Sequence, residues 1–389
     1  ARFLADLGAE VIKVEPPMGD PLRYTAVNEG RPLDQKENTS YDLENAGKTC
    51  ISLNTKSEEG REALEKLLAT ADVFICNWRQ SPLKRAGLDW ETLHEKYPKL
   101  VYGYVSGYGE KGPDKDLPGF DFTAFYARGG ILGPLRDKNS LPMLTVQGFG
   151  DHQVAMNLAA GVLAALFKAK MTGEGDHVVV SLFHSAIWDI SLMLQASQYG
   201  ADSTQYPMER WKLGNPLVLC YETADGQWLQ IAMPQYDRHY PILMNAMGYP
   251  ELADDARYYP QKNLIPNREE FSAWITAEFK KKTCDEWCKL LDANDLPYAI
   301  AQEWDSLLED KQAWASDCFY EMSYSNGNKR TLVRPPVLFD QMGLPPYERG
   351  PYLGEQTKDI LGELGYSAEA IDELIKSGAA IDMDPALRD

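Results

Sequence analysis

The sequence is poor in the residues from which disulfide frameworks and metal sites are built. Its 389 residues include six cysteines and five histidines. The cysteines are scattered along the chain, which predicts free thiols in a reducing, cytoplasmic compartment. Cys284 and Cys288 lie four residues apart, but no second pair follows them and the histidines lie elsewhere. We interpret them as two thiols on one face of a helix, and we expect no metal site.

Positive charge is also scarce. The chain has 39 lysines and arginines against 58 aspartates and glutamates, so its net charge is −19 at pH 7. Such a surface repels nucleic acid and anionic lipid, so we expect neither as a partner. An anionic ligand would need a local basic pocket. The sequence shows no signal peptide and no apolar run of about 18 residues, so we predict no membrane span.

The first half of the chain alternates strand and helix patterns. Short apolar runs rich in β-branched and aromatic residues predict buried parallel strands. These runs are 9–15, 48–54, 72–78, 100–107 and 177–183. Between the second and third runs, residues 57–69 place leucines on one face behind Ser57, which is typical of the start of a helix. The alternation predicts a doubly wound, Rossmann-like α/β domain.

The pattern changes after about residue 200. The elements expected there are a hairpin over 217–233, helices over about 235–247 and 269–293, a strand at 296–302 and a second hairpin that turns at Asn326-Gly327. We therefore predict three parts. Residues 1–200 form the N-terminal part of a large α/β domain, 201–310 form a smaller α+β domain, and 311–389 form a linker and a C-terminal part that returns to the large domain.

Residues 107–112 read "GYGEKG" and match the glycine pattern of dinucleotide-binding folds. That pattern requires a helix directly after the glycines to hold a pyrophosphate. Pro113 and a loop-forming segment follow here instead. We interpret the stretch as a flexible loop beside a pocket, which disfavours a nicotinamide or flavin site.

Basic residues recur near the ends of the predicted strands, among them Arg23, Lys48, Arg79 and Arg85. Because the carboxyl ends of strands in a doubly wound sheet meet at one crevice, these cations would suit a phosphate-bearing ligand. Solvated lysines and arginines are also common on any surface. The spacing alone leaves both interpretations open.

Asp151 stands between the turn "GFG" (148–150) and a long apolar helix. Its position suits a helix N-cap. The helix dipole would also keep its carboxylate ionised, which makes it a usable nucleophile towards an activated acyl group. The two roles are compatible, and spacing does not separate them. His152 lies in the first turn, where the dipole disfavours protonation, so we interpret it as a positional residue.

Taken in order, several segments resemble the class III, CaiB/BaiF-type, coenzyme A transferases, and the resemblance spans nearly the whole chain. The segments are "LADLGAEVIKVEPPMGDPLR", "NAGKTCISLN", "NWRQSPLKRAGLD", "SGYGEKGPDKDLPGFD", "GFGDHQVAMNLAAGVLAAL", "TGEGDHVVVSL", "GNPLVLCYETADGQWLQIA" and "PYLGEQTKDILGELGYS". Within the family, "GDPLRYTAVNEGRPL" and "YDLENAGK" resemble one branch in particular. That branch transfers CoA to (R)-2-hydroxy acids, of the phenyllactate or 2-hydroxyisocaproate type, in anaerobes that ferment amino acids.

The resemblance implies a mechanism in which Asp151 is the nucleophile. Asp151 would form a mixed anhydride and then an aspartyl-CoA thioester, with coenzyme A as co-substrate and without ATP or a metal. The amides of the "GFG" turn would stabilise the oxyanion. The CoA contacts implied by the family motifs are Arg23, Lys48, Asn77, Trp78 and Arg85, to which we add Arg79 from its place in the same loop.

The resemblance also implies an interlocked homodimer, and a 2-hydroxyacyl-CoA dehydratase as a downstream partner. The family normally opens with a strand and the start of a helix before "ARFLADLGAEV". We therefore expect that a segment belonging to the CoA-side wall precedes this sequence in the whole protein.

Other activities of the superfamily stay open as alternatives. The related racemases use a histidine in "GHD", where this chain has "GFD" (119–121), and Phe120 cannot transfer a proton. The glycine-rich loop of formyl-CoA transferases is absent, which favours an acceptor larger and more apolar than oxalate. A carnitine-like acceptor and a non-catalytic acyl-CoA-binding protein are further alternatives. The aromatic residues that either line an acyl pocket or belong to the core are Phe120, Phe122, Phe125, Tyr126 and Trp211.

Overall fold

Contacts within the chain divide the protein into two units, each assembled from segments that are distant in sequence. The first unit comprises Ala1–Gly129, Val146–Trp188 and Leu308–Asp389, and the second comprises Gly130–Thr145 and Asp189–Leu307. The computed structural model describes residues 1–199, 206–207, 209–343, 345 and 347–387 of these units. The domain boundaries near residues 200 and 310 remain a prediction.

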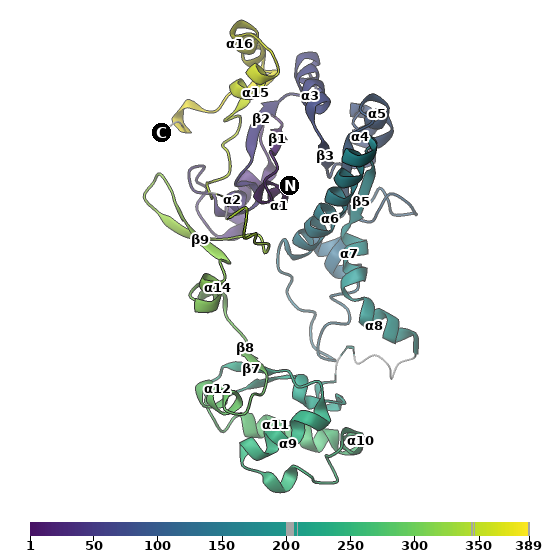
Figure 1. Cartoon of the computed structure of the whole chain (residues 1–389), viewed down its shortest axis with the longest axis vertical. Coiled ribbons are helices and arrows are strands. Elements are labelled where there is room, and N and C mark those ends of the chain that lie inside the picture. The colour runs from purple at the N-terminus through teal and green to yellow at the C-terminus, as the bar shows by residue number, and fades with distance from the viewer. Residues whose placement is uncertain (200–205, 208, 344, 346, 388–389) are drawn as a thin grey trace. The chain divides into compact units, whose positions relative to one another are not determined.

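Two three-stranded sheets and a hairpin form the β-structure of the first unit (Figure 1). In the first sheet, β2 (Thr49–Leu53) lies between a parallel β1 (Ile12–Glu15) and an antiparallel β11 (Ala380–Ile381). The second sheet is wholly parallel and has the order β3 (Val73–Cys76), β4 (Val101–Ser106) and β5 (His177–Ser181). The hairpin pairs β9 (Phe319–Ser323) with β10 (Lys329–Val333).

The five strands predicted in the first half are confirmed, and the fold is mixed α/β, but the strands do not join into one doubly wound sheet. The reason lies in β2. One of its edges is paired with β1, and the other edge is taken by β11, which returns from the C-terminal end of the chain. Since both edges of β2 are occupied, β3 cannot pair with it and instead belongs to a separate sheet with β4.

Helices cover these sheets. Those of the first unit are α1 (Arg2–Asp6), α2 (Thr39–Asn45), α3 (Glu58–Thr70), α4 (Gln80–Ala86), α5 (Trp90–Lys96), α6 (Phe149–Thr172), α7 (Leu182–Asp189), α14 (Lys311–Ala315), α15 (Thr357–Glu363) and α16 (Ala368–Ser377), with a 3-10 segment η1 (Pro21–Glu29) and a π-helical segment η2 (Asp121–Ala127). The helix α3 shows how they form. Ser57 caps its first turn, and Leu64, Leu67 and Leu68 bury one face in the core.

The helix α6 forms the crossover between β4 and β5, and it lies along β5 in Figure 1. Its buried positions recur every three or four residues, so one face packs on the parallel sheet. These positions include Val154, Leu158, Val162, Ala165 and Ala169. The expectation that no segment meets the length and hydropathy of a membrane span is wrong for α6. Its 24 residues meet both, as core helices also do.

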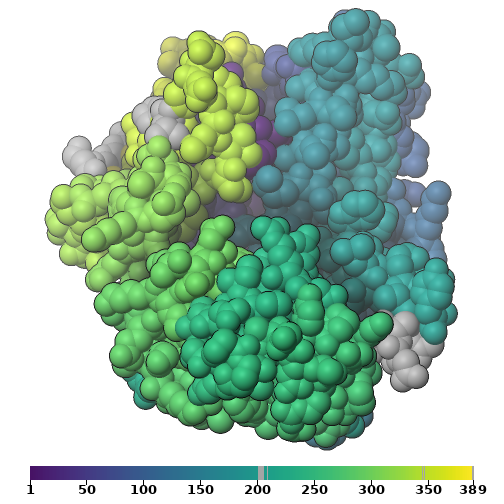
Figure 2. Space-filling view, turned by 60° about the horizontal axis from the view of Figure 1, so that its bottom comes forward, coloured from purple at the N-terminus to yellow at the C-terminus, as the bar shows by residue number. Residues whose placement is uncertain are grey.

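The second unit is built around a small antiparallel sheet. Its strands follow the order β6 (Cys220–Glu222), β7 (Trp228–Ile231) and β8 (Tyr298–Ile300). Its helices are α8 (Ser191–Ala196), α9 (Tyr236–Met247), α10 (Gln261–Leu264), α11 (Arg268–Phe279), α12 (Cys284–Asp292) and most of α13 (Trp304–Leu308). In the space-filling view the green residues of this unit form one closely packed body (Figure 2).

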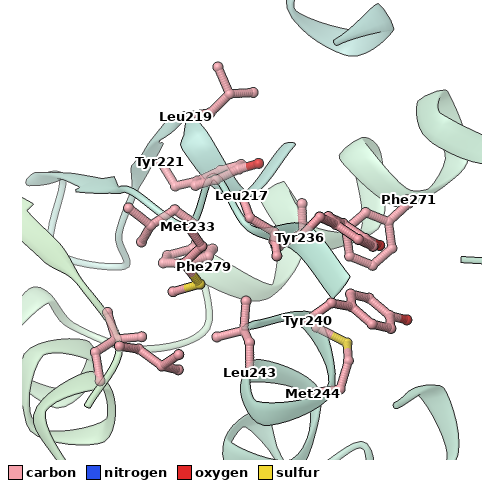
Figure 3. Close-up of a cluster of buried hydrophobic side chains, with 14 of the residues drawn as sticks. Leu217, Leu219, Tyr221, Met233, Tyr236, Tyr240, Leu243, Met244, Phe271 and Phe279 are labelled. Atoms are coloured by element: carbon pink, nitrogen blue, oxygen red, sulfur yellow. The ribbon is translucent and has the colours of Figure 1, made fainter. Parts of the chain in front are cut away.

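The core of the second unit is rich in aromatic side chains (Figure 3). Tyr236 and Tyr240 stand one turn apart on α9 and stack with ring centroids 5.0 Å apart. The ring of Phe271 from α11 lies 5.6 Å from that of Tyr240. Aromatic pairs in such arrangements add to the free energy gained by burying their surface. The helices and the sheet are therefore held together by ring contacts.

One helix predicted in this unit is in fact two. The stretch 269–293 breaks into α11 and α12, because Thr283 begins a new helix. The Thr283 side chain accepts the amide of Glu286, and the Glu286 side chain in turn accepts the amide of Thr283. This reciprocal capping box satisfies two amides that would otherwise be unpaired, so it favours a helix start at that point.

Phe279 provides a test of this core. It is fully buried, and its ring lies 4.6 Å from that of Tyr221 and 4.4 Å from that of Trp287. We expect Phe279→Ala to lower the free energy of unfolding by about 3–5 kcal/mol, the usual cost of such a cavity. Urea denaturation followed by tryptophan fluorescence measures this loss. Trp228→Ala, at a side chain that is 45% exposed, is the control and should cost much less. Equal midpoints for the two variants would contradict the packing described.

Candidate active site

The start of α6 differs from the sequence prediction, because Gly148 and not Asp151 is its N-cap. Gly148 adopts a φ of 80°, a left-handed conformation that glycine reaches without steric cost. Asp151 is the third residue of the helix that follows. Its carboxylate is exposed and accepts no hydrogen bond from the described residues. The carboxylate is thus not occupied by capping the helix.

A second carboxylate, Asp121, fixes the turn that precedes Asp151. The chain leaves β4 at Gly107 and returns at Gly119, so closely that a Cβ at Gly107 would lie 2.6 Å from the Gly119 Cα. This approach brings Asp121 beside the start of α6. Asp121 is 5% exposed, and its two oxygens accept the amides of Gly148 (2.8 Å) and Gly150 (3.0 Å). Asp121 therefore links the loop after β4 to the first turn of α6, on which the candidate nucleophile Asp151 stands.

Gly150 has no room for a side chain. A Cβ at this position would lie 2.4 Å from Asp121 Oδ1 and 2.3 Å from the ring of Phe125. Real Cβ atoms do not approach other atoms this closely, so any larger residue would push α6 away from Asp121. The glycine in the "GFG" turn is thus explained by the proximity of Asp121.

The same contacts bear on the oxyanion site that the resemblance implied. The amides of Gly148 and Gly150 already donate to Asp121, and the amide of Phe149 donates to the carbonyl of Val146 (3.4 Å). An oxyanion would have to displace a buried carboxylate from these donors. The geometry therefore argues against these three amides as an oxyanion hole.

The electrostatic surroundings of Asp151 also differ from the prediction. Although Asp151 is open to solvent on one side, the surrounding protein displaces part of the water around its carboxylate. This partial desolvation raises the pKa of Asp151, and the charges of Asp121 and Glu44 raise it further. These effects act in the opposite direction to the helix dipole, on which the prediction of a readily ionised group rested. A more basic carboxylate is a better nucleophile once it is ionised, so the environment suits attack on a carbonyl.

His152 is paired with Glu44, a residue of α2. The imidazole Nε2 lies 2.8 Å from Glu44 Oε1. This hydrogen bond raises the pKa of His152, and the charges of Glu44, Asp151 and Asp121 act in the same direction. The argument from the helix dipole, which disfavoured protonation, is therefore outweighed by a specific acidic partner.

Arg23, one of the residues predicted to contact CoA, has a side chain that is only 12% exposed. Its guanidinium forms two hydrogen bonds of 2.9 Å with Glu15 and a third with the carbonyl of Pro351. It also lies 3.9 Å from the centroid of the Tyr41 ring. These contacts give Arg23 a structural role in the first unit. It lines a 220 Å³ cavity together with Tyr41, Asp42 and residues 350–353.

Lys48 lies at the amino end of β2 and not at the carboxyl edge where the sequence analysis placed it. Its Nζ donates to Asn45 Oδ1 at 2.9 Å. Burial lowers the pKa of Lys48 to about 8, and the charge of Lys13 adds to the effect. Lys48 lines a 520 Å³ cavity with Tyr324, Tyr347 and Arg349, and neither this cavity nor the one at Arg23 is lined by Asp151.

The remaining predicted residues, Asn77, Trp78, Arg79 and Arg85, lie close together in sequence. The first three form the exposed turn between β3 and α4, and Trp78 is 46% exposed. Arg85 is exposed on α4, where it donates to Ser81 Oγ at 2.7 Å. The turn follows the carboxyl end of β3, and the start of α6 lies at the same end of this parallel sheet. This edge therefore holds exposed cations, an aromatic ring and the candidate nucleophile.

The candidate aromatic residues separate into two groups. Phe125 and Tyr126 are buried in the core, whereas Phe120 and Phe122 are 67% and 45% exposed. Trp211 is 46% exposed and belongs to the second unit. Phe149, which the sequence analysis did not single out, is 49% exposed two residues before Asp151. Phe120 and Phe149 therefore flank the Asp121–Asp151 region with accessible rings.

Comparison with known proteins gives a consistent result. A profile of the family described as CoA-transferase family III matches residues 1–357. The chain belongs to CoA-transferase family III. It is 52% identical to the cinnamoyl-CoA:phenyllactate CoA-transferase of Clostridium sporogenes over 96% of this chain and 91% of that protein. It is 40% identical to the (R)-2-hydroxy-4-methylpentanoate CoA-transferase of Clostridioides difficile over 96% and 92%.

Two solved structures share the fold of this transferase. A crystal structure of an M. tuberculosis protein matches with a TM-score of 0.80 at 25% identity, over 92% of this chain and 93% of that one. A CAIB/BAIF family protein from Brucella suis matches with a TM-score of 0.77 at 26% identity, over 93% and 94%. The resemblance inferred from the sequence motifs is thus confirmed.

The structural role of Asp121 can be tested separately from the catalytic reaction. In Asp121→Asn, an NH₂ group replaces one of the two carboxylate oxygens and cannot accept a hydrogen bond. One of the two backbone N–H groups at the start of α6 therefore loses its partner. We expect the free energy of unfolding to fall by about 1–3 kcal/mol. Hydrogen exchange at residues 148–152, followed by mass spectrometry, should accelerate. Asp114→Asn, which removes an exposed ion pair with Arg128, is the matched control. Unchanged exchange in Asp121→Asn would exclude the tethering role.

Proposed function

We propose that this transferase moves CoA from an acyl-CoA donor to an (R)-2-hydroxy carboxylate of the phenyllactate or 2-hydroxyisocaproate type, with Asp151 as the nucleophile. The observation that carries the proposal is the exposed Asp151 carboxylate on a rigidly held helix start. The names of the two curated relatives support the hydroxy-acid acceptor.

In the first half-reaction an Asp151 oxygen attacks the thioester carbonyl of the donor. The C–S bond breaks, CoA leaves as the thiolate, and a mixed anhydride links Asp151 to the donor acyl group. The thiolate then attacks the aspartyl carbonyl of the anhydride. The donor leaves as a free carboxylate, and an aspartyl-CoA thioester remains.

In the second half-reaction the carboxylate of the hydroxy acid attacks the aspartyl thioester. CoA thiolate leaves again, and a second anhydride joins Asp151 to the new acyl group. The thiolate attacks the acyl carbon, which releases the 2-hydroxyacyl-CoA and restores the Asp151 carboxylate. Each step exchanges one activated acyl group for another, so the reaction needs no ATP.

The surroundings of Asp151 support this sequence of steps. The raised pKa makes the carboxylate more basic, and Asp121 holds the helix start in place without using Asp151 itself. The exposed rings of Phe120 and Phe149 suit an aromatic or branched acyl group better than a small polar one such as oxalate. Phe120 also argues against a racemase, because the ring offers no proton-transfer group.

We assign CoA binding to Lys48, Asn77, Trp78, Arg79 and Arg85, with Arg23 as a residue of the supporting wall. The exposed turn after β3 offers the Trp78 indole ring for the adenine and the Arg79 guanidinium for a phosphate, and α4 adds the exposed guanidinium of Arg85. Arg23 is already saturated by Glu15 and its other partners, so a phosphate would have to compete with a buried carboxylate.

We also propose that the working form is a homodimer and that a 2-hydroxyacyl-CoA dehydratase consumes the product. The exposed apolar side chains of α6 support an interface there, since Phe167 and Met171 are 72% and 74% exposed. A 2-hydroxyacyl-CoA is the type of thioester from which such a dehydratase removes water.

Substitution of Asp151 is the direct test of the nucleophile. We expect Asp151→Ala to lower kcat by at least about a thousandfold, while the exposed side chain makes the variant as stable as the wild type. Incubation of the wild type with acyl-CoA followed by hydroxylamine should label residue 151 as a hydroxamate, detectable by mass spectrometry. An active wild type that carries no label at residue 151 would disprove the covalent route.

The acceptor is identified by an activity panel. Phenyllactate, 4-hydroxyphenyllactate, indolelactate and 2-hydroxyisocaproate are compared as acceptors, with oxalate and carnitine as controls. A preference for oxalate or carnitine would replace the hydroxy-acid assignment by the alternative transferases.

The CoA contacts give a further prediction. Arg85→Ala should weaken CoA binding about tenfold at low salt, and the difference from the wild type should shrink as salt screens the charge. Isothermal titration of CoA at two ionic strengths measures this. Arg257→Ala, an exposed arginine of the second unit, is the control. Arg23→Ala should instead lower the thermal midpoint, because it leaves Glu15 buried without its partner.

A further inference from the structure

Negative charge surrounds Asp151, which creates a difficulty for the proposed function on which this inference rests. Asp121 and Glu44 both act on Asp151, and the whole chain carries a net charge of −19. The second half-reaction nevertheless brings the carboxylate of the acceptor next to this cluster. An anion at this position needs a cation or a set of free donors to offset the repulsion.

The amides at the start of α6 do not meet this need. Those of Gly148 and Gly150 are held by Asp121, as described above. Within the described part of the chain, His152 is the one group whose charge favours the ionised form of Asp151. His152 is thus the cationic group available to offset the negative charge beside Asp151.

The contacts of His152 leave one side of its ring available. Its Nε2 is bonded to Glu44 Oε1 at 2.8 Å, which fixes the ring and favours the imidazolium. Its Nδ1 has no hydrogen-bond partner among the described residues. The side chain is 59% exposed, so a ligand can reach it from solvent.

We propose that His152, held by Glu44, binds the carboxylate of the acceptor acid through Nδ1–H and so brings it to the aspartyl-CoA thioester formed at Asp151. The Glu44–His152 pair then acts as a receptor for an anion in an otherwise acidic site. The carboxylate itself remains the nucleophile of the second half-reaction, and no proton needs to be transferred to or from it.

Lys48 is a weaker candidate for the same role. Its Nζ donates to Asn45, and burial favours the neutral amine. It acts on Glu44 but not directly on Asp151. Its cavity is lined by residues of the β9–β10 hairpin and the 347–356 segment, not by α6.

The test measures the binding of the acceptor acid separately from the reaction of Asp151 with the donor thioester. In His152→Gln we expect the KM for the hydroxy acid to rise about tenfold. The rate at which the donor acylates Asp151 should change less than twofold when it is measured at a pH where Asp151 is fully ionised in both proteins. His239→Gln is the matched control, because His239 is a partly exposed residue of the second unit whose Nδ1 contacts, among the described residues, the carbonyl of Gln235. His152→Arg keeps a cation at this position and should restore the KM for the acid.

The pH dependence gives an independent readout. The imidazolium is paired with Glu44 from α2, and the charges of Asp151 on α6 and Asp121 on η2 also act on it. Because these carboxylates raise the pKa of His152, the KM for the acid should stay low below that pKa and rise as the pH increases through it. Glu44→Gln should move this rise to lower pH, and His152→Arg should abolish it.

Two results would overturn the proposal. One is an unchanged KM for the acid in His152→Gln, and the other is a pH dependence of KM that Glu44→Gln does not move. Either result leaves the function of Asp151 intact if the hydroxamate label still forms. Loss of the label in the wild type would instead remove the covalent mechanism, so the two failures are distinguishable.

Discussion

The arrangement of the candidate active site depends on one buried carboxylate. Asp121 accepts the amides of Gly148 and Gly150, and it thereby joins the loop after β4 to the first turn of α6. Burial and its own negative charge make Asp121 costly unless these amides are present, so the two segments hold each other in place. Asp151 is free to react because Asp121, and not Asp151, accepts the hydrogen bonds of the amides at the start of the helix.

The same interaction determines the electrostatics of the site. A carboxylate beside Asp151 raises the pKa of that residue and excludes the neighbouring amides from binding a second anion. An acidic cluster that makes the nucleophile basic also repels anionic substrates. The pairing of His152 with Glu44 resolves this conflict at one point of the surface, because it fixes a positive charge where the protein is otherwise negative.

Much of the chain could be predicted from local patterns. The parallel strands were found because their short apolar runs are typical of buried strands, and α3 because Ser57 and a leucine face mark its start. The family followed from segments that are specific in order and composition. The break at Thr283 was missed, although the Thr283–Glu286 capping box is visible in the sequence, because the helical pattern continues on both sides of it.

The sequence by itself determined the five strands of the first half, the family and the candidate nucleophile, since each of these depends on residues that are near one another along the chain. Only the tertiary structure decided which acid faces which amide. Nothing near Asp121 in the sequence indicates that it reaches Gly150, and nothing near Glu44 indicates that it reaches His152. Likewise, β11 closes the edge of β2 from the far end of the chain. Such pairings are set by the folding of distant segments onto one another, and local periodicity carries no information about them.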